Sequence, residues 1–369
     1  KKGTADFEAE ETIQSNKPVE IPINNYLIRI DVLVDLKEPK KSDYDMDWDF
    51  YGKDYIEFFK VAKEKNIDYL LAVGGGSVLD GTKFIAAAAK YQGEDTWDIL
   101  AKSNIVVVKE ALPIGAVLTL PATGSEMNGN SVITRVSTQE KMAFGSPKVM
   151  PQFSILDPEC VFTLPDKQVA NGIVDAFIHV IEQYLTFNVN SPIQDRFAES
   201  ILQTLIEIAP TILKDPSDYK AASNFMWSCT MALNGLIQQG VPSDWAIHMM
   251  GHELTALFGI DHARTLAIIT ESHYTYNLES KKEKLAQYAE RVWNVTEGTP
   301  KEKALAGIKK TTEFFHSLGI ETKLSEYTED YKGTAQIISK RFTDRGWLGL
   351  GEHQNLAPND VEKIVEMSY

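Results

Sequence analysis

Five residues have the types and the spacing of a metal site. The segment "WAIHMMGHELTALFGIDHARTLA" contains three of the chain's seven histidines, His248, His252 and His262. The earlier segment "NGIVDAFIHVIEQ" places Asp175 and His179 four residues apart, so that a helix puts both side chains on one apolar face. A carboxylate buried there needs a partner, and a metal ion supplies one. One carboxylate with imidazoles suits Zn²⁺ or Fe²⁺ and leaves a position for a substrate oxygen.

The spacing also allows other interpretations of these residues. The Asp–His pair of the earlier segment can be a hydrogen bond with a structural role only. His248 and His252 are four residues apart on one predicted helix, so spacing alone does not decide which of them binds a metal. A zinc protease is disfavoured, because Ala256 stands where the HExxH motif has its second histidine. His262 follows the predicted helix end at Gly259, where a loop can fold back over the helix.

A glycine-rich loop is the second feature whose residues could bind a ligand. In "AVGGGSVLDGTK", Gly74, Gly75, Gly76 and Ser77 lie between a predicted buried strand and a predicted helix. Glycines let the backbone approach a phosphate, and the helix start offers unpaired N–H groups to the anion. The loop matches neither GxGxxG nor the P-loop pattern, and a plain tight turn is the alternative.

The loop "TLPATGSEMNGN" follows the next predicted strand and carries Thr119, Thr123, Ser125 and Asn128. Ligand crevices of open parallel sheets form at the carboxyl ends of the strands. Two adjacent polar loops therefore favour a cofactor site over two turns without a function.

These residues require two kinds of supporting structure. From about residue 55 the pattern alternates between helical spacing and buried strands ("IDYLLAVGGG", "LPIGAVLTLP"), which predicts a parallel sheet covered by helices. After "SILDPECVFTLP" long amphipathic runs follow one another, and this second half is predicted to be all-helical. We therefore expect an α/β dinucleotide-binding domain over residues 1–160, with residues 1–51 atypical, and an all-α metal and substrate domain over residues 161–369.

The composition narrows the class of protein. A chain of 369 residues exceeds the size of one hydrophobic core, and 43% hydrophobic with 24% charged residues is typical of a globular protein. A formal charge of -15 disfavours nucleic acid and anionic membrane surfaces as partners, so a small molecule is expected. Cys160 and Cys229 are too few for a disulfide framework. With no apolar run of spanning length and no signal-peptide pattern, we expect a cytoplasmic protein.

Two segments resemble the signatures of a known family. "SILDPECVFTLPDKQVANGIVDAFIHVIE" resembles the first signature of the iron-containing alcohol dehydrogenases, and "WAIHMMGHELTALFGIDHART" resembles the second. "GGGSVLDGTK" and "LTLPATGSE" are similar to the cofactor loops of that family. "QDRFAE", "MALNGLI" and "AERVWNVTEG" are most similar to its NADPH-dependent butanol dehydrogenase and aldehyde reductase branch. The agreement runs from about residue 52 to the last residue.

The resemblance implies a role for each candidate residue. It implies the metal ligands Asp175, His179, His248 and His262, and it leaves His252 near the reacting oxygen. The implied cofactor contacts are Gly75, Gly76, Ser77, Asp80, Thr119, Thr123, Asn128 and Lys141. The implied partners are NADP(H), with NAD possible, one Fe²⁺ or Zn²⁺ ion, an aldehyde or alcohol, and a second copy of the chain in a homodimer.

The implied reaction is reversible hydride transfer between NADP(H) and short-chain aldehydes or primary alcohols. The metal serves as a Lewis acid on the carbonyl oxygen. His252 is the candidate proton donor, and the alternative is a structural bond from His252 to a carboxylate such as Glu253. A pocket lined by Trp245, Phe144 or Met249 would favour short unbranched aldehydes.

The N-terminal segment departs from the family pattern. Residues 1–51 contain no counterpart of the second glycine loop that grips the adenosine side of the cofactor, and we expect that the recorded residues there are not the native ones. Two other functions remain open at this point. One is a metal- and NAD-dependent lyase of the dehydroquinate synthase type, and the other is a non-catalytic protein that binds a metal and a nucleotide.

Overall fold

The structure is a computed structural model, which describes residues 19–23, 26–30, 60 and 62–369. The chain forms two compact units, Lys1–Asp47 and Trp48–Tyr369. In the first unit, β1 (Val19–Ile23) and β2 (Tyr26–Ile30) pair antiparallel. The prediction that residues 1–51 lack a glycine loop falls mostly outside the described residues, and the domain boundary predicted near residue 160 stays a prediction.

A parallel sheet organises the start of the second unit, as the alternating pattern predicts. Its strands lie in the order β3-β4-β7 and pair parallel throughout. The strands are β3 (Leu70–Gly75), β4 (Ile114–Leu120) and β7 (Phe153–Leu156). Because the strands are parallel, β3 and β4 end at the same edge of the sheet, where both predicted cofactor loops begin.

Helix α3 (Gly76–Lys90) follows β3 directly and packs between two hydrophobic cores. Its Leu79 belongs to the larger core, which extends from the sheet into the helical half of the chain. Its Phe84 belongs to a smaller core that includes Ile133 and Phe144. Helix α3 therefore packs against a core on each of two faces, and this packing holds the glycine loop at its start in place.

The other elements between β3 and the helical half are short. Asn130–Arg135 and Glu140–Gly145 pair as an antiparallel hairpin that the sequence pattern does not predict. These elements are α4 (Asp98–Ala101), η1 (Ser125–Met127), β5 (Asn130–Arg135), η2 (Val136–Thr138), β6 (Glu140–Gly145), η3 (Pro147–Val149) and η4 (Pro158–Thr163).

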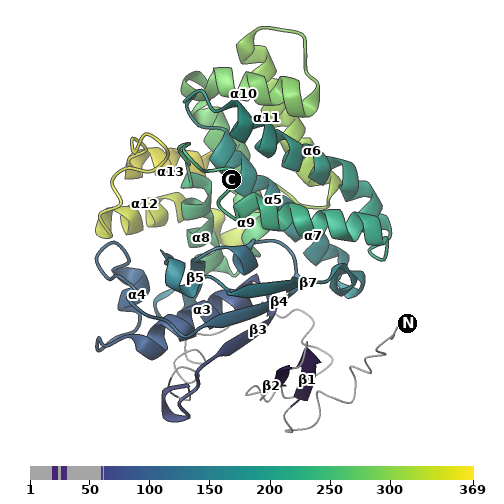
Figure 1. Cartoon of the computed structure of the whole chain (residues 1–369). Coiled ribbons are helices and arrows are strands. Elements are labelled where there is room, and N and C mark those ends of the chain that lie inside the picture. Colours follow the sequence, from purple (N-terminus) through teal and green to yellow (C-terminus); the bar gives the residue numbers. More distant parts are fainter. Residues whose placement is uncertain (1–18, 24–25, 31–59, 61) are drawn as a thin grey trace. The chain divides into compact units, whose positions relative to one another are not determined.

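From residue 166 onward the chain is helical apart from connecting segments and one isolated bridge between Leu350 and Leu356, as predicted. We call β3 to η4 the α/β part and α5 to α13 the helical part; Figure 1 shows them stacked one above the other. The long helices are α5 (Asp166–Tyr184), α6 (Pro192–Lys214), α7 (Tyr219–Leu233), α8 (Ala246–Phe258), α9 (His262–Tyr276), α10 (Leu278–Trp293) and α11 (Pro300–Ser317). The remaining elements are η5 (Leu324–Glu326), η6 (Glu329–Tyr331), α12 (Thr334–Asp344) and α13 (Pro358–Glu366).

Helix α5 is the central helix of the helical part. Every residue from Val169 to Tyr184 is buried, and the apolar ones belong to the larger core. A helix that is buried on all sides can carry polar residues only where they find partners, so Asp175, His179 and Glu182 on this helix need an explanation. Within the described residues, no helix combines the length and the apolar character that a bilayer span requires.

Candidate metal centre and cofactor loops

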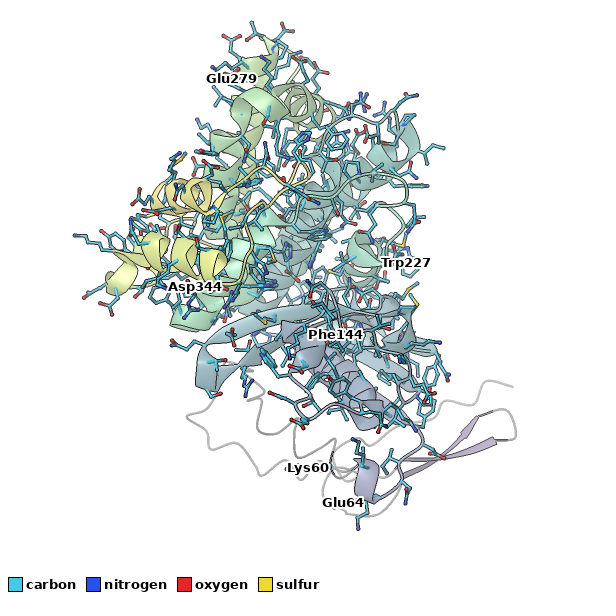
Figure 2. The ribbon with its side chains drawn as sticks, turned by 90° about the vertical axis from the view of Figure 1, so that its left-hand side faces the viewer. Lys60, Glu64, Phe144, Trp227, Glu279 and Asp344 are labelled. Atoms are coloured by element: carbon cyan, nitrogen blue, oxygen red, sulfur yellow. The ribbon has the colours of Figure 1, made fainter. Side chains whose placement is uncertain are left out.

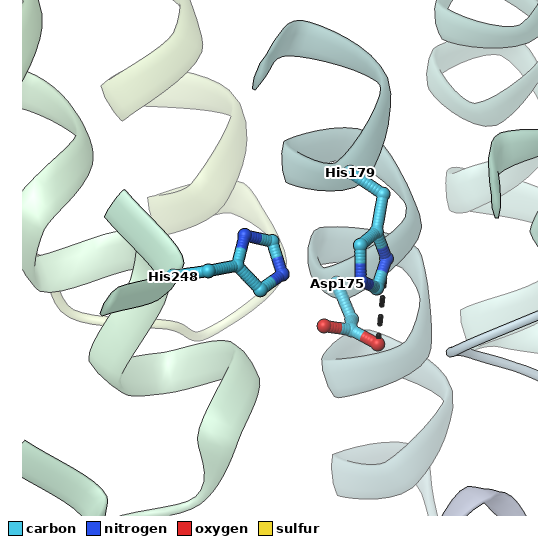
Figure 3. A group of neighbouring side chains, drawn as sticks. All are labelled: Asp175, His179 and His248. Carbon is cyan, nitrogen blue, oxygen red and sulfur yellow. Dashed lines mark ion pairs between the residues drawn. The ribbon is translucent and has the colours of Figure 1, made fainter. Parts of the chain in front are cut away.

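Three of the predicted metal ligands lie together between α5 and α8. Asp175 and His179 project from α5 toward His248 on α8 (Figure 3). One ligand atom from each of these three side chains lies within 4.8 Å of the other two, and all three side chains are buried. The Asp175 Oδ2 atom is 3.7 Å from His179 Nδ1, as the i, i+4 spacing predicts.

His262 reaches the same carboxylate from another helix. Its Nε2 atom is 3.9 Å from Asp175 Oδ1, and its ring centre is 5.3 Å from that of His248. It lies outside the tight group of three, and it is the first residue of α9 rather than part of a loop. The turn between α8 and α9 is short because Gly259 ends α8 with a φ of 68° and Asp261 already precedes α9.

Polar atoms without partners mark the space between these side chains. Among the described residues, no hydrogen bond is made by Asp175 Oδ1, His179 Nδ1, His248 Nε2 or His262 Nδ1, although all are buried. Buried polar atoms without a partner cost free energy, so several in one place are unusual unless a ligand satisfies them. One carboxylate oxygen with imidazole nitrogens is a donor set that suits a divalent transition metal.

The electrostatics of the site favour neutral imidazoles. Burial lowers the pKa of His179 and that of His248 to about 4. Burial, and after it the positive charge of Lys141, lowers the pKa of His252 and that of His262 well below the usual range. Only a neutral imidazole has a lone pair for a metal ion, so these rings are in the protonation state that binding requires.

Sequence reasoning gave no role to Glu182, which is also part of this site. Its side chain is fully buried on α5, and it contacts His248 Nδ1 in a very short hydrogen bond. Burial and the neighbouring Asp244 raise the pKa of Glu182 to about 8. The sequence could have pointed to Glu182 through its position, because Glu182 lies seven residues after Asp175 on the same helix face.

His252 is near the predicted ligands but is not bonded to Glu253. Its ring centre lies 5.0 Å from that of His262 and 6.1 Å from that of His248. Its Nε2 atom is buried without a hydrogen-bond partner among the described residues. Glu253 instead forms ion pairs with Arg341 and Arg345, which disfavours the structural alternative for His252.

The two predicted cofactor loops touch one another. A Cβ atom added to Gly76 would lie 2.7 Å from the Thr123 side chain, and one added to Gly75 would lie 3.0 Å from Leu120 Cβ. Glycine is therefore needed at Gly76 for the close approach of the loops. Gly75 precedes α3 without a side-chain cap, and the positive end of the helix dipole at this point attracts an anion.

Asp80 and Asn128 hold the second loop against α3. The Asp80 carboxylate accepts hydrogen bonds from Ser125 Oγ at 2.6 Å and from the Val132 N–H at 2.9 Å. The Asn128 side chain donates to the Gly124 carbonyl of its own loop at 2.9 Å, and its Oδ1 atom accepts from Lys83 Nζ on α3 at 3.1 Å. Both side chains are buried, so most of their bonding capacity serves the chain itself.

Lys83 completes this cluster and was not singled out from the sequence. Its side chain has no solvent exposure, and Nζ donates to Ser125 Oγ (2.7 Å), Asn128 Oδ1 (3.1 Å) and the Asn130 carbonyl (2.7 Å). Burial lowers its pKa to about 8, and the Asp80 carboxylate opposes that shift. The available signal was its spacing of three residues from Asp80 on a predicted helix.

Lys141 connects the cofactor loops with the histidines. It is half-buried on β6, and its charge lowers the pKa of His252 and of His262 while also acting on Asp80. The hairpin that carries it is tied to α8, because Arg345 forms ion pairs with Glu253 and with Glu140 at 3.7 Å.

The three residues predicted to line a substrate pocket have different places. The Trp245 ring packs against those of His179 and His248, with centres 6.3 and 5.3 Å away. Met249 lines an open cavity of about 530 Å³ together with Trp347, Leu348 and Leu350. Phe144 instead lies in the smaller core of the α/β part, where it is labelled in Figure 2.

Family comparisons cover most of the described chain. Residues 53–158 match the model of the iron-containing alcohol dehydrogenases, and residues 169–369 match that of the C-terminal domain of the Fe-containing alcohol dehydrogenase family. The chain is 51% identical over 308 residues to the NADPH-dependent aldehyde reductase YqhD of Escherichia coli, covering 83% of this chain and 79% of that protein. It is 44% identical over 310 residues to a probable NADH-dependent butanol dehydrogenase 1 of Bacillus subtilis, covering 84% and 79%.

Solved structures agree with these sequence matches. The crystal structure of Escherichia coli YqhD matches with a TM-score of 0.84 and 49% identity, covering 86% of this chain and 82% of that one. The NADH-dependent butanol dehydrogenase A of Thermotoga maritima matches with a TM-score of 0.80 and 33% identity, covering 86% and 80%. The chain therefore belongs to the iron-containing alcohol dehydrogenase family, in the branch of the aldehyde reductase and the butanol dehydrogenases.

Proposed function

We propose that this protein is a metal-dependent oxidoreductase that transfers a hydride between NADP(H) and short-chain aldehydes or primary alcohols. The observation that carries the proposal is the group of buried, unpartnered ligand atoms on Asp175, His179 and His248, next to two touching cofactor loops. The relatives include an aldehyde reductase and butanol dehydrogenases, which favours this function over the lyase and over a non-catalytic binding protein.

Asp175, His179, His248 and His262 are the proposed metal ligands. The first three already lie within reach of one ion, and His262 reaches the Asp175 carboxylate from the start of α9. Their low histidine pKa values keep the imidazoles neutral and ready to bind. When bound, the metal supplies a Lewis acid for the aldehyde oxygen, and the nicotinamide cofactor supplies the hydride.

The cofactor is proposed to lie along the two loops at the carboxyl edge of the sheet. The backbone of Gly75, Gly76 and Ser77 at the start of α3 would hold the diphosphate. Thr119 and Thr123 line the second loop, while Asp80 and Asn128 keep that loop in place. Lys141 contributes positive charge near both the cofactor and the histidines.

His252 is proposed to relay, from water, the proton that the product alcohol receives, because its low pKa keeps the imidazole neutral between transfers. Its imidazole is close to His262, lacks a partner at Nε2 and is not engaged by Glu253. From this position His252 would pass a proton to the reacting oxygen, directly or through one water molecule.

The substrate is proposed to enter beside Met249. The open cavity that Met249 shares with Trp347 and Leu350 has both apolar and polar lining, and Trp245 packs against two predicted ligands. The apolar side chains of this lining suit the hydrocarbon tail of a short aldehyde, while the proposed metal site suits its oxygen.

The proposal also names the metal ion and the preferred cofactor. A carboxylate with three imidazoles suits Fe²⁺ and Zn²⁺ alike. The relatives include an NADPH-dependent enzyme and NADH-dependent ones, so we place NADPH first because the NADPH-dependent relative is 51% identical. A homodimer and a cytoplasmic location stay predictions, which sedimentation and cell fractionation test.

The test of the proposed function follows NADPH absorbance while the purified chain is supplied with butanal. We expect metal-dependent oxidation of NADPH and formation of butanol, with slower turnover when NADH replaces NADPH. No oxidation of either cofactor by the metal-loaded chain, with butanal or other short aldehydes, would overturn the proposal.

A further inference from the structure

Glu182 is a buried carboxyl group that contacts the proposed metal ligand His248 and has no role in the proposed function. Its side chain is fully buried on α5. Asp175, His179 and Glu182 occupy positions i, i+4 and i+7, so one face of α5 presents all three to α8. A carboxylate without solvent needs bonds to both of its oxygens.

Both Glu182 oxygens are engaged by the first turn of α8. One oxygen accepts a hydrogen bond from the Ile247 N–H at 2.7 Å, and the other contacts His248 Nδ1. Helix α8 has no capping side chain at Trp245, which has a φ of 62°. Glu182 therefore satisfies a first-turn N–H group that would otherwise lack an intrahelical partner.

The contact with His248 also decides which ring nitrogen carries the proton. When His248 binds a metal ion through Nε2, its Nδ1 atom carries the ring proton and donates it to the Glu182 oxygen, and the positive charge of the metal ion favours the ionised carboxylate that accepts it. A neutral imidazole with its proton on Nδ1 has a lone pair on Nε2. That Nε2 atom is the one buried without a partner beside Asp175 and His179.

We propose that Glu182 is a positioning residue that fixes the ring orientation and the Nδ1–H tautomer of His248, so that Nε2 is presented as a metal ligand. This inference rests on the proposed metal site. Helix α5 then contributes to three ligands, two on its own face and one across the interface with α8. Carboxylates that orient histidine ligands in this way commonly change metal affinity by about 10- to 100-fold when they are replaced.

Glu182→Gln separates this role from simple capping of α8. The amide has one oxygen and one NH₂ group, so it cannot accept from the Ile247 N–H and from His248 Nδ1 in the original way. With the oxygen kept on Ile247, the NH₂ group donates to Nδ1 and drives the proton to Nε2. The helix cap is thus preserved while the tautomer is reversed.

The matched control is Glu199→Gln on α6. Glu199 is also a buried carboxylate with several donors, among them Tyr184 Oη at 2.8 Å and Arg291 at 2.9 Å. It tests the general cost of removing a buried negative charge. Its hydrogen-bond partners are Tyr184, Arg196, Gln287 and Arg291, and none of these is a proposed metal ligand.

The first measurement is the Zn²⁺ dissociation constant, obtained by chelator competition. We expect Glu182→Gln to weaken it by about 10- to 100-fold and Glu199→Gln to leave it within twofold. The second measurement uses ¹⁵N-histidine labelling of the metal-free chain above about pH 9, where Glu182 is ionised and nuclear magnetic resonance distinguishes the two tautomers. We expect His248 to carry its proton on Nδ1 in the wild type and on Nε2 in Glu182→Gln.

The outcomes separate this inference from the proposed function. An unchanged Zn²⁺ constant in Glu182→Gln, an equal loss in Glu199→Gln, or an Nε2–H tautomer in the wild type would overturn the inference. If the wild type binds no metal, the proposed function fails, and the tautomer measurement still decides the role of Glu182.

Discussion

Lys83→Met tests whether the buried lysine is what joins the two cofactor loops. The substitution keeps the length of the side chain but removes three hydrogen bonds, to Ser125, Asn128 and the Asn130 carbonyl. At about 1 kcal/mol net for each bond, we expect a loss of about 3 kcal/mol in the free energy of unfolding. Asp80 also loses its neighbouring cation, which adds to the destabilisation.

The assay combines urea unfolding with an NADPH titration of the folded variant. We expect weaker NADPH binding as well as lower stability, because the loop with Thr123 is no longer tied to α3. Lys90→Met is the matched control, since Lys90 is exposed in the last turn of the same helix and should change stability by less than about 1 kcal/mol. Equal stability and equal NADPH affinity of Lys83→Met and the wild type would refute the reasoning.

Four further predictions concern the metal centre and its packing. His262→Ala should abolish bound metal and turnover while circular dichroism shows the helices intact, and retention of metal and activity would remove His262 from the ligand set. His252→Ala should keep the metal but slow turnover and alter the pH–rate profile; an unchanged profile would exclude the proton role. Because the pKa of His252 is low in the folded chain, the unfolded chain takes up a proton at His252 at a higher pH than the folded chain does. The free energy of unfolding therefore falls as the pH drops below 6.5, the usual pKa of histidine. In the metal-free chain, His252→Ala should therefore flatten the slope of stability against pH below 6.5 by up to about 1.4 kcal/mol per unit, whereas an equal slope would contradict this sign. Gly172→Ala should cost about 1–3 kcal/mol in urea unfolding, because the new Cβ would lie 2.4 Å from the Pro121 carbonyl oxygen; wild-type stability would show that α5 does not pack this closely.

The fold was predictable where hydrophobic periodicity is long. The runs that become α5, α6 and α7 and the buried strands β3 and β4 were all identified from pattern, because burial imposes a regular spacing on many residues. The hairpin of β5 and β6 was missed. Its strands alternate weakly, since polar residues such as Ser131 and Lys141 occupy it for reasons that depend on contacts elsewhere in the chain.

The candidate site was predictable as a set of residues but not as a network. Spacing placed Asp175 and His179 on one helix face, and the resemblance suggested His248 and His262 as their partners. The roles of Glu182 and Lys83 depend on contacts between segments 42 to 66 residues apart in sequence, which no local pattern contains. Spacing likewise could not show that Glu253 forms ion pairs with Arg341 on α12 and with Arg345 at the end of that helix, and not a bond with His252.

The most direct test of the central claim is a metal titration of the stripped wild-type chain, with the rate of NADPH oxidation by butanal as the signal. The account predicts negligible turnover without metal and a linear rise with added Fe²⁺ or Zn²⁺ to a plateau at a single ion per chain. Full turnover by the stripped chain, or no turnover at any metal content, would contradict it.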